Sequence, residues 1–420
     1  MSLSNLPEGQ QSRFNTTYSV SFPEFPTFKY QPYKITIVQE ERSHDVAILR
    51  FQRQTNWYHK ALKTGTLVKI TWQNNRKAKG SFYGHVVSYK RTRAAQVDHE
   101  IEIRCVAASF PLKDSVANTW VNKTVPEIVQ AIAKKNKMKA IVTPHQGRFS
   151  QISQYGMSYW EFLHELAYKI GYAVWVENTT IYFKSLDEII EKNFGAIPLL
   201  TFEDEFIPPF HSFVERTLDK FEPMISDFVE DSDQPIRSGK TITGVDPITG
   251  KAYSSVSQAK KGLKKNAAQV IFTDNSSLDV ANSKPFADSL TKAKAERTRF
   301  QMPAQFYAQG DPRIRPFNLV EISGIDSTTD GYWLVRSVTH TMTKDGHYFA
   351  DGVVVSDGRG ENVSSQKRVK GNAMMPALNL TNFGNGDSLS LAAKPTPSKN
   401  VFMYNQTQSG YTLTNQTWKV

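Results

Sequence analysis

Residues 155–183 constrain the fold of this chain more than any other segment, because they combine a helix start, a helix stop and a hairpin. Ser158 can cap a helix, and Glu161, three residues later, completes a capping box. Gly171 suits the left-handed position that ends a helix. YAVWVE and TIYF then predict a β-hairpin around Asn178-Thr179. The helix between these signals has one apolar face, formed by residues at helical spacing: Tyr159, Phe162, Leu163, Leu166 and Ile170.

Composition places the chain among folded, strand-rich proteins. Its 420 residues are enough for two to four domains, and a hydrophobic content of 39% with 12% aromatic residues is typical of a globular protein. We expect no membrane insertion, because no apolar run approaches the roughly 20 residues of a membrane-spanning helix. We also expect no secretory signal at the N-terminus. The single cysteine, Cys105, excludes an intrachain disulfide and fits synthesis in a reducing cytoplasm.

The net charge of +11 favours an acidic partner or nucleic acid, but the charges are scattered along the chain. A solvated surface is therefore the preferred interpretation, since clustering and not net charge indicates a binding face. The one dense basic cluster could hold phosphate if it lay on a short helix, although a solvated face or an acidic protein partner explains it better. Its members are Lys260, Lys261, Lys264 and Lys265.

Changes in pattern along the chain predict five segments. The first is punctuated by proline and phenylalanine and reads as an extended arm. The second holds alternating strands of a small β-barrel or sandwich, and the third is an α+β module that opens with a capping box at Thr124 and Glu127. The fourth returns to strands after a long, polar, exposed excursion at 231–285, and the fifth is a charge-poor arm. The predicted boundaries are 1–30, 31–115, 116–190, 191–360 and 361–420.

Two parts of the chain resemble each other. TGTLVKITW followed by GSFYGHVVSY matches PFNLVEISG followed by DGYWLVRSVTH. In each part, a strand with the pattern L-V-x-I precedes a glycine, two aromatic residues and an alternating strand. Such self-similarity indicates a duplicated unit. Coincidence between two ordinary β-meanders is the alternative, because strands use few residue types.

The segment S-x-W-E-F-L-x-x-L-A-x-x-x-G-Y at 158–172, followed by a hairpin, resembles the hub proteins of phage tail baseplates. It is similar to the late control D family and to the VgrG spike proteins of type VI secretion. GDPRIRPFNLVEISG at 310–324 and DGYWLV at 330–335 match the closing barrel of that family. The resemblance covers roughly residues 30–358, and none of these motifs is a catalytic signature.

The resemblance implies an α+β, mainly β fold with two small, related, tube-like β-barrels, an inserted helix–helix–hairpin module and extended terminal arms. It also implies a homotrimeric, non-enzymatic hub in the virion tail baseplate, made in the host cytoplasm, that joins the sixfold tail tube to the threefold spike. The expected partners are the tail tube protein, the central spike or tip protein, other baseplate proteins and the tape measure, with DNA only as passing cargo. Two alternatives stay open, namely a receptor- or glycan-binding tip protein and a hub associated with cell-wall hydrolysis.

No catalytic, cofactor or metal site is expected. Cys105 alternates with exposed positions in EIEIRCVAA and reads as a buried structural thiol. His340 and His347 could face each other across a hairpin, but no cysteine or carboxylate cluster accompanies them, and His340 is expected to end a strand with its ring half buried. The acidic cluster at 203–205 reads as a solvated loop. No nucleophile elbow or phosphate-binding glycine motif occurs.

Partner binding is expected at three aromatic residues of the C-terminal arm. Tyr404, Tyr411 and Trp418 are spaced by seven in an otherwise polar segment. In a single extended strand this odd spacing would alternate their faces. They are candidate anchors for pockets of a neighbouring protein. An ordinary terminal strand packed on its own domain is the alternative.

Overall fold

The computed structural model describes the chain as two compact units, residues 1–366 and 367–420. Each unit is described by itself. The described residues are 16–26, 28, 30–52, 63–74, 78–94, 97–145, 148–193, 199–202, 224–230, 237–245, 250–257, 264–267, 270–275, 287–288, 290–291, 300, 302–326, 329–362, 400–407 and 410–417. The mainly β, α+β fold class predicted from the sequence is confirmed.

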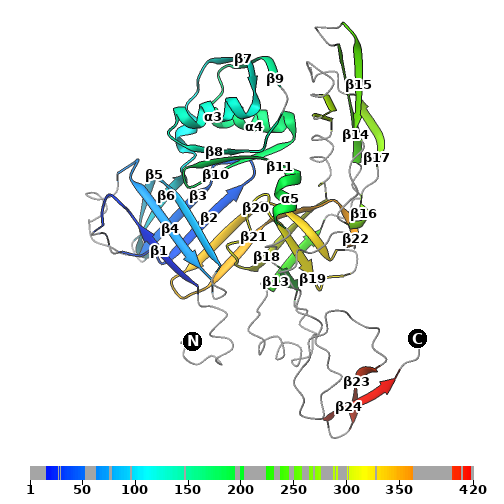
Figure 1. Cartoon of the computed structure of the whole chain (residues 1–420). Helices are drawn as coiled ribbons and strands as arrows, with labels where there is room; N and C mark the ends of the chain where they lie inside the picture. The colour runs from blue at the N-terminus through cyan, green and yellow to red at the C-terminus, as the bar shows by residue number, and fades with distance from the viewer. Residues whose placement is uncertain are drawn as a thin grey trace. The chain divides into compact units, whose positions relative to one another are not determined.

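The first set of strands forms a sheet in the order β1-β4-β5-β6-β3-β2 (Figure 1). Each strand alternates buried and outward residues, so one face packs on a core that includes Ile35, Leu49, Ile70 and Ile103. Cys105 is buried in this core and its neighbour Arg104 is exposed, as the alternation predicts. The strands are β1 (Thr17–Ser21), β2 (Lys34–Glu40), β3 (Val46–Gln52), β4 (Leu67–Gln73), β5 (Lys79–Ala94) and β6 (Val97–Ala107).

The outer edge of β1 is covered by a side chain. The Gln31 amide accepts a hydrogen bond from the Val20 backbone N–H (3.0 Å) and donates one to the Val20 carbonyl (3.2 Å). One side chain thereby takes the place of a neighbouring strand. Residues 17–21 lie within the segment expected to be an arm, yet they pair with β4 from Thr17↔Gln73 to Ser21↔Lys69. Val20 and Phe22 are buried in the core, which explains why this edge strand forms.

The second set of strands pairs in a closed cycle, β20-β19-β12-β13-β18-β21 and back to β20. The core inside it includes Phe306, Ile322, Trp333 and Val354. In β18 every second residue is buried, as expected for a strand with one face on a core. The strands are β12 (Leu199–Phe202), β13 (Met224–Glu230), β18 (Met302–Gln309), β19 (Leu319–Ser323), β20 (Gly331–Thr343) and β21 (Tyr348–Ser356).

The internal repeat predicted from the sequence is visible in the strand pairings. Four antiparallel pairings of the first set have counterparts in the second set, in the same chain order. β2–β3 corresponds to β13–β18 and β3–β6 to β18–β21, while β5–β6 corresponds to β20–β21 and β4–β5 to β19–β20. The pairs Leu67↔His85 and Leu319↔Leu334 occupy equivalent positions. Both sets also contain a β-bulge, between residues 86 and 88 of β5 and between residues 335 and 337 of β20. Each bulge lies two residues beyond the residue just named in that strand, His85 in β5 and Leu334 in β20. Two unrelated meanders would not share a bulge at an equivalent position.

The two sets share strand β20. Its C-terminal half pairs with β2 from Lys34↔Thr343 to Glu40↔Ser337, and its N-terminal half pairs with β19. Its opposite edge pairs with β21. A continuous sheet therefore runs from the first set into the second.

A buried hydrogen-bonded chain reinforces this connection. The Trp72 indole N–H donates to the Tyr348 hydroxyl (3.0 Å), which lies 2.9 Å from His340 Nδ1. His340 Nε2 lies 3.0 Å from the Ile314 carbonyl, which can only accept, so Nε2 carries the proton and Nδ1 accepts from Tyr348. Burial lowers the pKa of His340 to about 4, so the ring is neutral at pH 7, as this arrangement requires.

Two glycines make room for these rings. A Cβ at Gly80 would overlap the Trp72 ring, and a Cβ at Gly310 would overlap the Tyr348 ring. The expectation that His340 ends a strand with a half-buried ring is wrong. It lies inside β20, opposite Ala350, and is fully buried, because hydrogen bonds satisfy both ring nitrogens. It does not face His347, which precedes β21.

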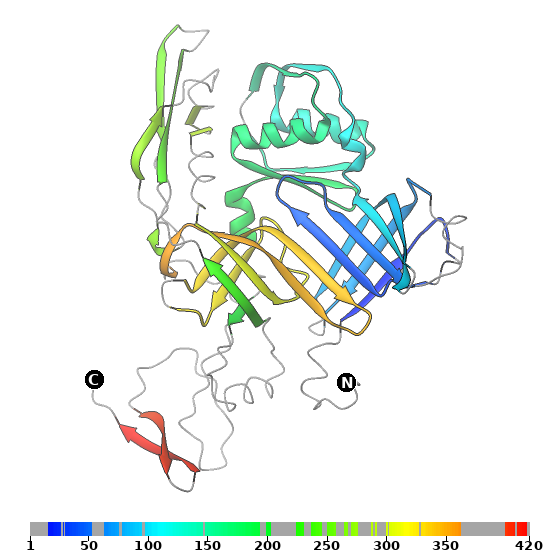
Figure 2. The ribbon, with the colours of Figure 1, turned by 180° about the vertical axis from the view of Figure 1, so that it is seen from behind.

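The α+β module packs two helices between two small sheets (Figure 2). Both predicted capping boxes form, Thr124 with Glu127 and Ser158 with Glu161, and Gly171 adopts φ 69°. The helix faces meet in one core with Ile132, Leu163 and Phe183. The elements are β7 (Asn118–Thr124), α3 (Val125–Lys135), β8 (Lys139–Val142), β9 (Arg148–Gln154), α4 (Tyr159–Ile170), β10 (Tyr172–Glu177), β11 (Thr180–Ser185) and α5 (Leu186–Asn193).

The polar excursion at 231–285 contains strands, whereas the sequence favoured an exposed loop. β14 pairs with β15 and β17, and β16 pairs with β22. Thr241, Ile242 and Thr243 explain β14, because β-branched residues favour strands even in a polar segment. Lys264 and Lys265 belong to β16, so the short helix considered for the lysine cluster is wrong, while Lys260 and Lys261 lie outside the described residues. The strands are β14 (Arg237–Val245), β15 (Ala252–Ser257), β16 (Lys264–Ala267), β17 (Val270–Asn275) and β22 (Gly358–Asn362).

The C-terminal unit contains a hairpin of β23 (Asn400–Thr407) and β24 (Gly410–Thr417). Tyr404 pairs with Leu413 and Tyr411 with Gln406. The two tyrosines therefore lie on different strands of the hairpin, so the alternation expected for a single strand does not apply to them. Trp418 lies outside the described residues.

Replacing Tyr348 with Phe tests the buried chain that links the two sets. Loss of the hydroxyl leaves the Trp72 N–H and His340 Nδ1 buried without a partner, so we expect the free energy of unfolding to fall by about 1–3 kcal/mol. Urea denaturation measures this change. Tyr155→Phe is the matched control, because Tyr155 is 85% exposed. Equal stability of Tyr348→Phe and the control would contradict the role assigned to the hydroxyl.

Candidate functional site

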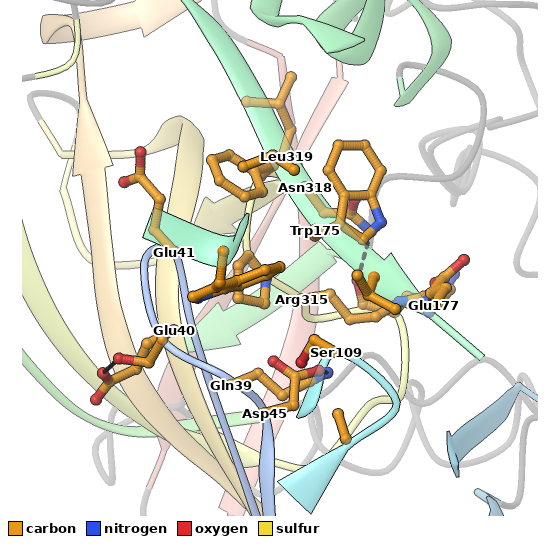
Figure 3. A pocket seen from close by; sticks show the side chains of 18 residues that line it. Gln39, Glu40, Glu41, Asp45, Ser109, Trp175, Glu177, Arg315, Asn318 and Leu319 are labelled. Atoms are coloured by element: carbon orange, nitrogen blue, oxygen red, sulfur yellow. Dashed lines mark hydrogen bonds and ion pairs between the residues drawn. The ribbon is translucent and has the colours of Figure 1, made fainter. Parts of the chain in front are cut away.

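A pocket of about 300 Å³ lies where three distant parts of the chain meet, and we call it the junction pocket (Figure 3). One side comes from the end of β2 and the turn that follows it, a second from α4 and β10, and a third from the loop before β19. In Figure 3, Gln39, Asp45 and Ser109 lie together at one end, while Trp175, Asn318 and Leu319 lie at the other. Arg315 and Glu177 lie between these two groups.

The loop 310–318 is shaped by its own polar groups. Asp311 is fully buried and accepts from the Arg313 backbone N–H (2.8 Å) and from its guanidinium (2.9 and 2.7 Å). Asn318 donates to the Arg313 carbonyl (3.0 Å). These bonds fold the chain tightly and direct Arg315 and Phe317 to the pocket.

Phe317 has a backbone conformation that is uncommon for a bulky residue. Its φ is 68°, a region that costs side-chain-bearing residues free energy. Hydrogen bonds on both sides hold it there, from Phe317 N–H to the Val335 carbonyl and from Val335 N–H to the Asn318 carbonyl, each 2.9 Å. The ring is buried against Trp175 and the module residues Leu186 and Ile189. Phe317 therefore joins the second set of strands to the α+β module.

Asp45 is the most perturbed acid of the pocket. Burial raises the pKa of its carboxyl to about 7, with a hydrogen bond from Gln39 and the charge of Arg315 opposing this and the charge of Glu177 adding to it. The Gln39 amide donates to Asp45 Oδ2 (2.7 Å). The Arg315 guanidinium pairs with Glu177. A carboxyl in such an environment changes its charge near neutral pH.

A second polar group lies behind the pocket wall. His44 Nδ1 is 2.7 Å from the Ser109 hydroxyl, and its ring stacks on Trp160 at a centroid distance of 4.7 Å. Burial, followed by the charge of Lys113, lowers the pKa of His44. The pair fixes the Trp160 indole against the pocket.

The arrangement can bind a polar guest. Among the described residues, no group of three His, Cys, Asp or Glu side chains could hold a metal ion. The described part of the chain also has no helix long and apolar enough to cross a membrane. Burial raises the pKa of the Cys105 thiol to about 12, which leaves it unreactive.

Sequence reasoning did not find this site. Asp45, Gln39, Glu177 and Arg315 come from segments far apart in the chain, and no spacing rule connects them. Residues 313–318 stood out only through the resemblance. The acidic cluster at 203–205 lies outside the described residues. Tyr404 and Tyr411 lie in the separate C-terminal unit.

Comparison with known proteins shows similarity in fold. No family model and no curated protein matches the chain. A tail protein from Neisseria meningitidis MC58 superposes with a TM-score of 0.55 at 11% identity, over 82% of this chain and 97% of that one. The 43 kDa tail protein of prophage MuSo2 from Shewanella oneidensis superposes with a TM-score of 0.53 at 12% identity, over 82% and 99%. The chain has the tail-protein fold.

A third similar structure comes from a secretion system. The E. coli c3393 protein, a component of the type VI secretion system described as similar to the T4 tail proteins gp27 and gp5, superposes with a TM-score of 0.50 at 11% identity. The overlap covers 82% of this chain and 79% of that one. The resemblance to phage tail hubs and VgrG proteins is thereby confirmed at the level of the tail-protein fold.

Asp45→Asn tests the environment of the pocket carboxyl. In the folded protein its pKa is about 7, above the unfolded value near 3.8, so its contribution to stability is fully present below about pH 4 and is lost as pH rises through 7. Asparagine stays neutral, so the stability of Asp45→Asn relative to wild type should rise from pH 4 to pH 8, by on the order of 2–4 kcal/mol. Urea denaturation at both pH values measures it. A difference that stays constant with pH would contradict the raised pKa.

Proposed function

We propose that this chain is a structural hub of a phage or phage-like tail baseplate. In this proposal three copies form a ring that joins the sixfold tail tube to the threefold central spike or tip. The tail-protein fold supports a structural role in a tail. It acts by binding and not by catalysis, and its place is the virion tail baseplate.

The repeated set of five strands is the observation that carries the proposal. Each chain holds two sets with the same order, the same pairings and a bulge at an equivalent position. A ring of three such chains presents six surfaces built on the same strand pattern. A threefold ring can then match a sixfold tube, because each chain contacts the tube through two related surfaces.

The remaining parts of the chain suit assembly roles. The segments 31–115 and 191–360 supply most of the two strand sets, 116–190 supplies the module that lies between them in the sequence, and 361–420 is an arm. Of the predicted arm 1–30, residues 17–21 instead form strand β1 of the first set. Tail tube, spike or tip, other baseplate proteins and the tape measure are the proposed partners, and DNA passes as cargo. Tyr404, Tyr411 and Trp418 are the proposed partner-binding residues of the C-terminal arm.

The absolute mass of the purified chain in solution tests the ring. Light scattering behind size exclusion should give three times the chain mass of 47.5 kDa. If the ring needs the tube or spike as a template, the trimer should appear when the neighbouring tail proteins are added. A monomer that stays monomeric with all of these proteins present would overturn the hub proposal.

Removing the aromatic rings of the hairpin tests the C-terminal arm. Tyr404→Ala together with Tyr411→Ala removes one aromatic ring from each strand of the hairpin, so binding of the partner should weaken by about 2 kcal/mol or more. Thr412→Ala, a small polar residue of the same hairpin, is the matched control. Affinity for purified tail proteins measures both variants, and an equal effect of the two would exclude the tyrosines as anchors.

A further inference from the structure

The base of the junction pocket carries a hydrogen-bond acceptor for which the described residues supply no donor. Gln39 Oε1 is buried and receives no hydrogen bond from the described part of the chain. The neighbouring Asp45 carboxylate is bound by the neutral Gln39 amide. The Arg315 guanidinium, whose charge lowers the pKa of Asp45, is itself paired with Glu177, whose charge raises that pKa. A carboxylate in this desolvated position is poorly stabilised by the protein itself.

The remaining charges of the pocket are engaged elsewhere. Arg313 pairs with Asp311, Arg315 with Glu177, and Glu41 with Arg336. Glu40 and Asp45 form no ion pair with any residue that the structure describes. The pocket therefore has an excess of negative charge, and a cation is the guest that would offset it.

These two carboxylates mark an entrance and a base. Glu40 and Ser43 are the exposed residues of the lining, and the Ser43 hydroxyl donates to Glu40 (2.9 Å). Asp45 and Ser109 lie deeper, with Ser109 1% exposed. A positive group entering beside Glu40 would meet Asp45 and Gln39 at the far end.

The apolar side chains of the lining suit an aliphatic stem. They include Trp160, Val174 and Trp175, and the indole of Trp160 is held by His44. Two wall donors, Trp160 Nε1 and Arg315 Nε, are buried and make no hydrogen bond within the described residues. The carbonyl oxygen of a peptide that carries the cation is a suitable acceptor for them.

We propose that the junction pocket binds an arginine side chain of a partner protein, with its guanidinium on Asp45 and Gln39. Guanidinium offers five donors in one plane, which matches a carboxylate beside an amide oxygen, and it is less strongly hydrated than ammonium. A volume of about 300 Å³ is at the lower end for small-molecule sites and fits a single long side chain. This site does not depend on the proposed hub function.

Binding should depend on pH because Asp45 must be ionised. Its pKa of about 7 means that the carboxylate is mainly present at pH 8 and mainly protonated at pH 6. The groups facing it are Gln39 on β2, Glu177 on β10 and Arg315 on the loop, with Glu40, Glu41 and Arg313 elsewhere in the lining. An arginine side chain should therefore bind more weakly at pH 6 than at pH 8.

Calorimetric titration of the full chain with N-acetyl-arginine-N-methylamide tests the proposal. At pH 8 this probe should bind at least about tenfold more tightly than its citrulline analogue, which has nearly the same shape but no charge, a difference of about 1.4 kcal/mol. Asp45→Asn should remove most of this preference. Glu165→Gln is the matched control, because Glu165 pairs with Lys169 on α4, away from the pocket.

Two results would overturn the proposal. One is equal binding of the arginine and citrulline probes to the wild-type chain, including the absence of binding by both. The other is unchanged binding of the arginine probe to Asp45→Asn. If that variant does not fold, the comparison of pH 6 with pH 8 on the wild-type chain replaces it, and equal affinity at the two pH values then counts against the site.

Discussion

Strand β20 is the element on which the rest of the structure depends, because it belongs to both sets of strands. Along one edge it pairs first with β19 and then with β2, and along the other it pairs with β21. Its residue His340 anchors a buried chain of hydrogen bonds that ends at Trp72 in the first set. Buried hydrogen bonds of this kind reduce stability most when one partner is lost and the other stays unsatisfied. These bonds therefore hold the two sets of strands in one register. The loop 310–318, which shapes the junction pocket, joins the same chain of hydrogen bonds through the Ile314 carbonyl.

The two repeats have diverged most at their boundaries. In the second set, β12 pairs with β19 and β13 in parallel and completes a cycle. In the first set, β1 is antiparallel to β4, and on its other side the Gln31 side chain binds the Val20 backbone. The shared part is the five-strand pattern with its bulge, while each end is finished differently. The equivalent positions Lys69 and Glu321 even carry opposite charges, so the repeats share a backbone plan more than a surface.

Local signals in the sequence predicted the parts of the fold that local physics determines. Thr124 and Glu127, Ser158 and Glu161, and Gly171 all act as expected, because a cap depends on residues within one turn. Pairing between β2 and β20 joins residues about 300 positions apart, and no pattern within either strand specifies it. His340 shows the same limit, since its burial depends on Ile314 and Tyr348. The L-V-x-I repeat was found from sequence, but the structure aligns the aromatic residues of its two parts one position differently. Tyr83, the second aromatic residue of the first part, pairs with Lys69, and the equivalent pair is Glu321 with Tyr332, the first aromatic residue of the second part. The pocket could not be predicted, because Gln39, Glu177 and Arg315 meet only after the whole unit has folded.

The amide of Gln31 has a consequence for the tendency of this sheet to pair with other molecules. An uncovered edge strand is a template on which a strand of another molecule can add, and long-lived intermediates with such edges aggregate. On β1 the outward N–H and C=O of Val20 are already occupied by one side chain. An intruding strand would have to displace that amide before its own ladder could start at this point. A single glutamine side chain thus hinders the addition of a further strand at this point of the sheet edge.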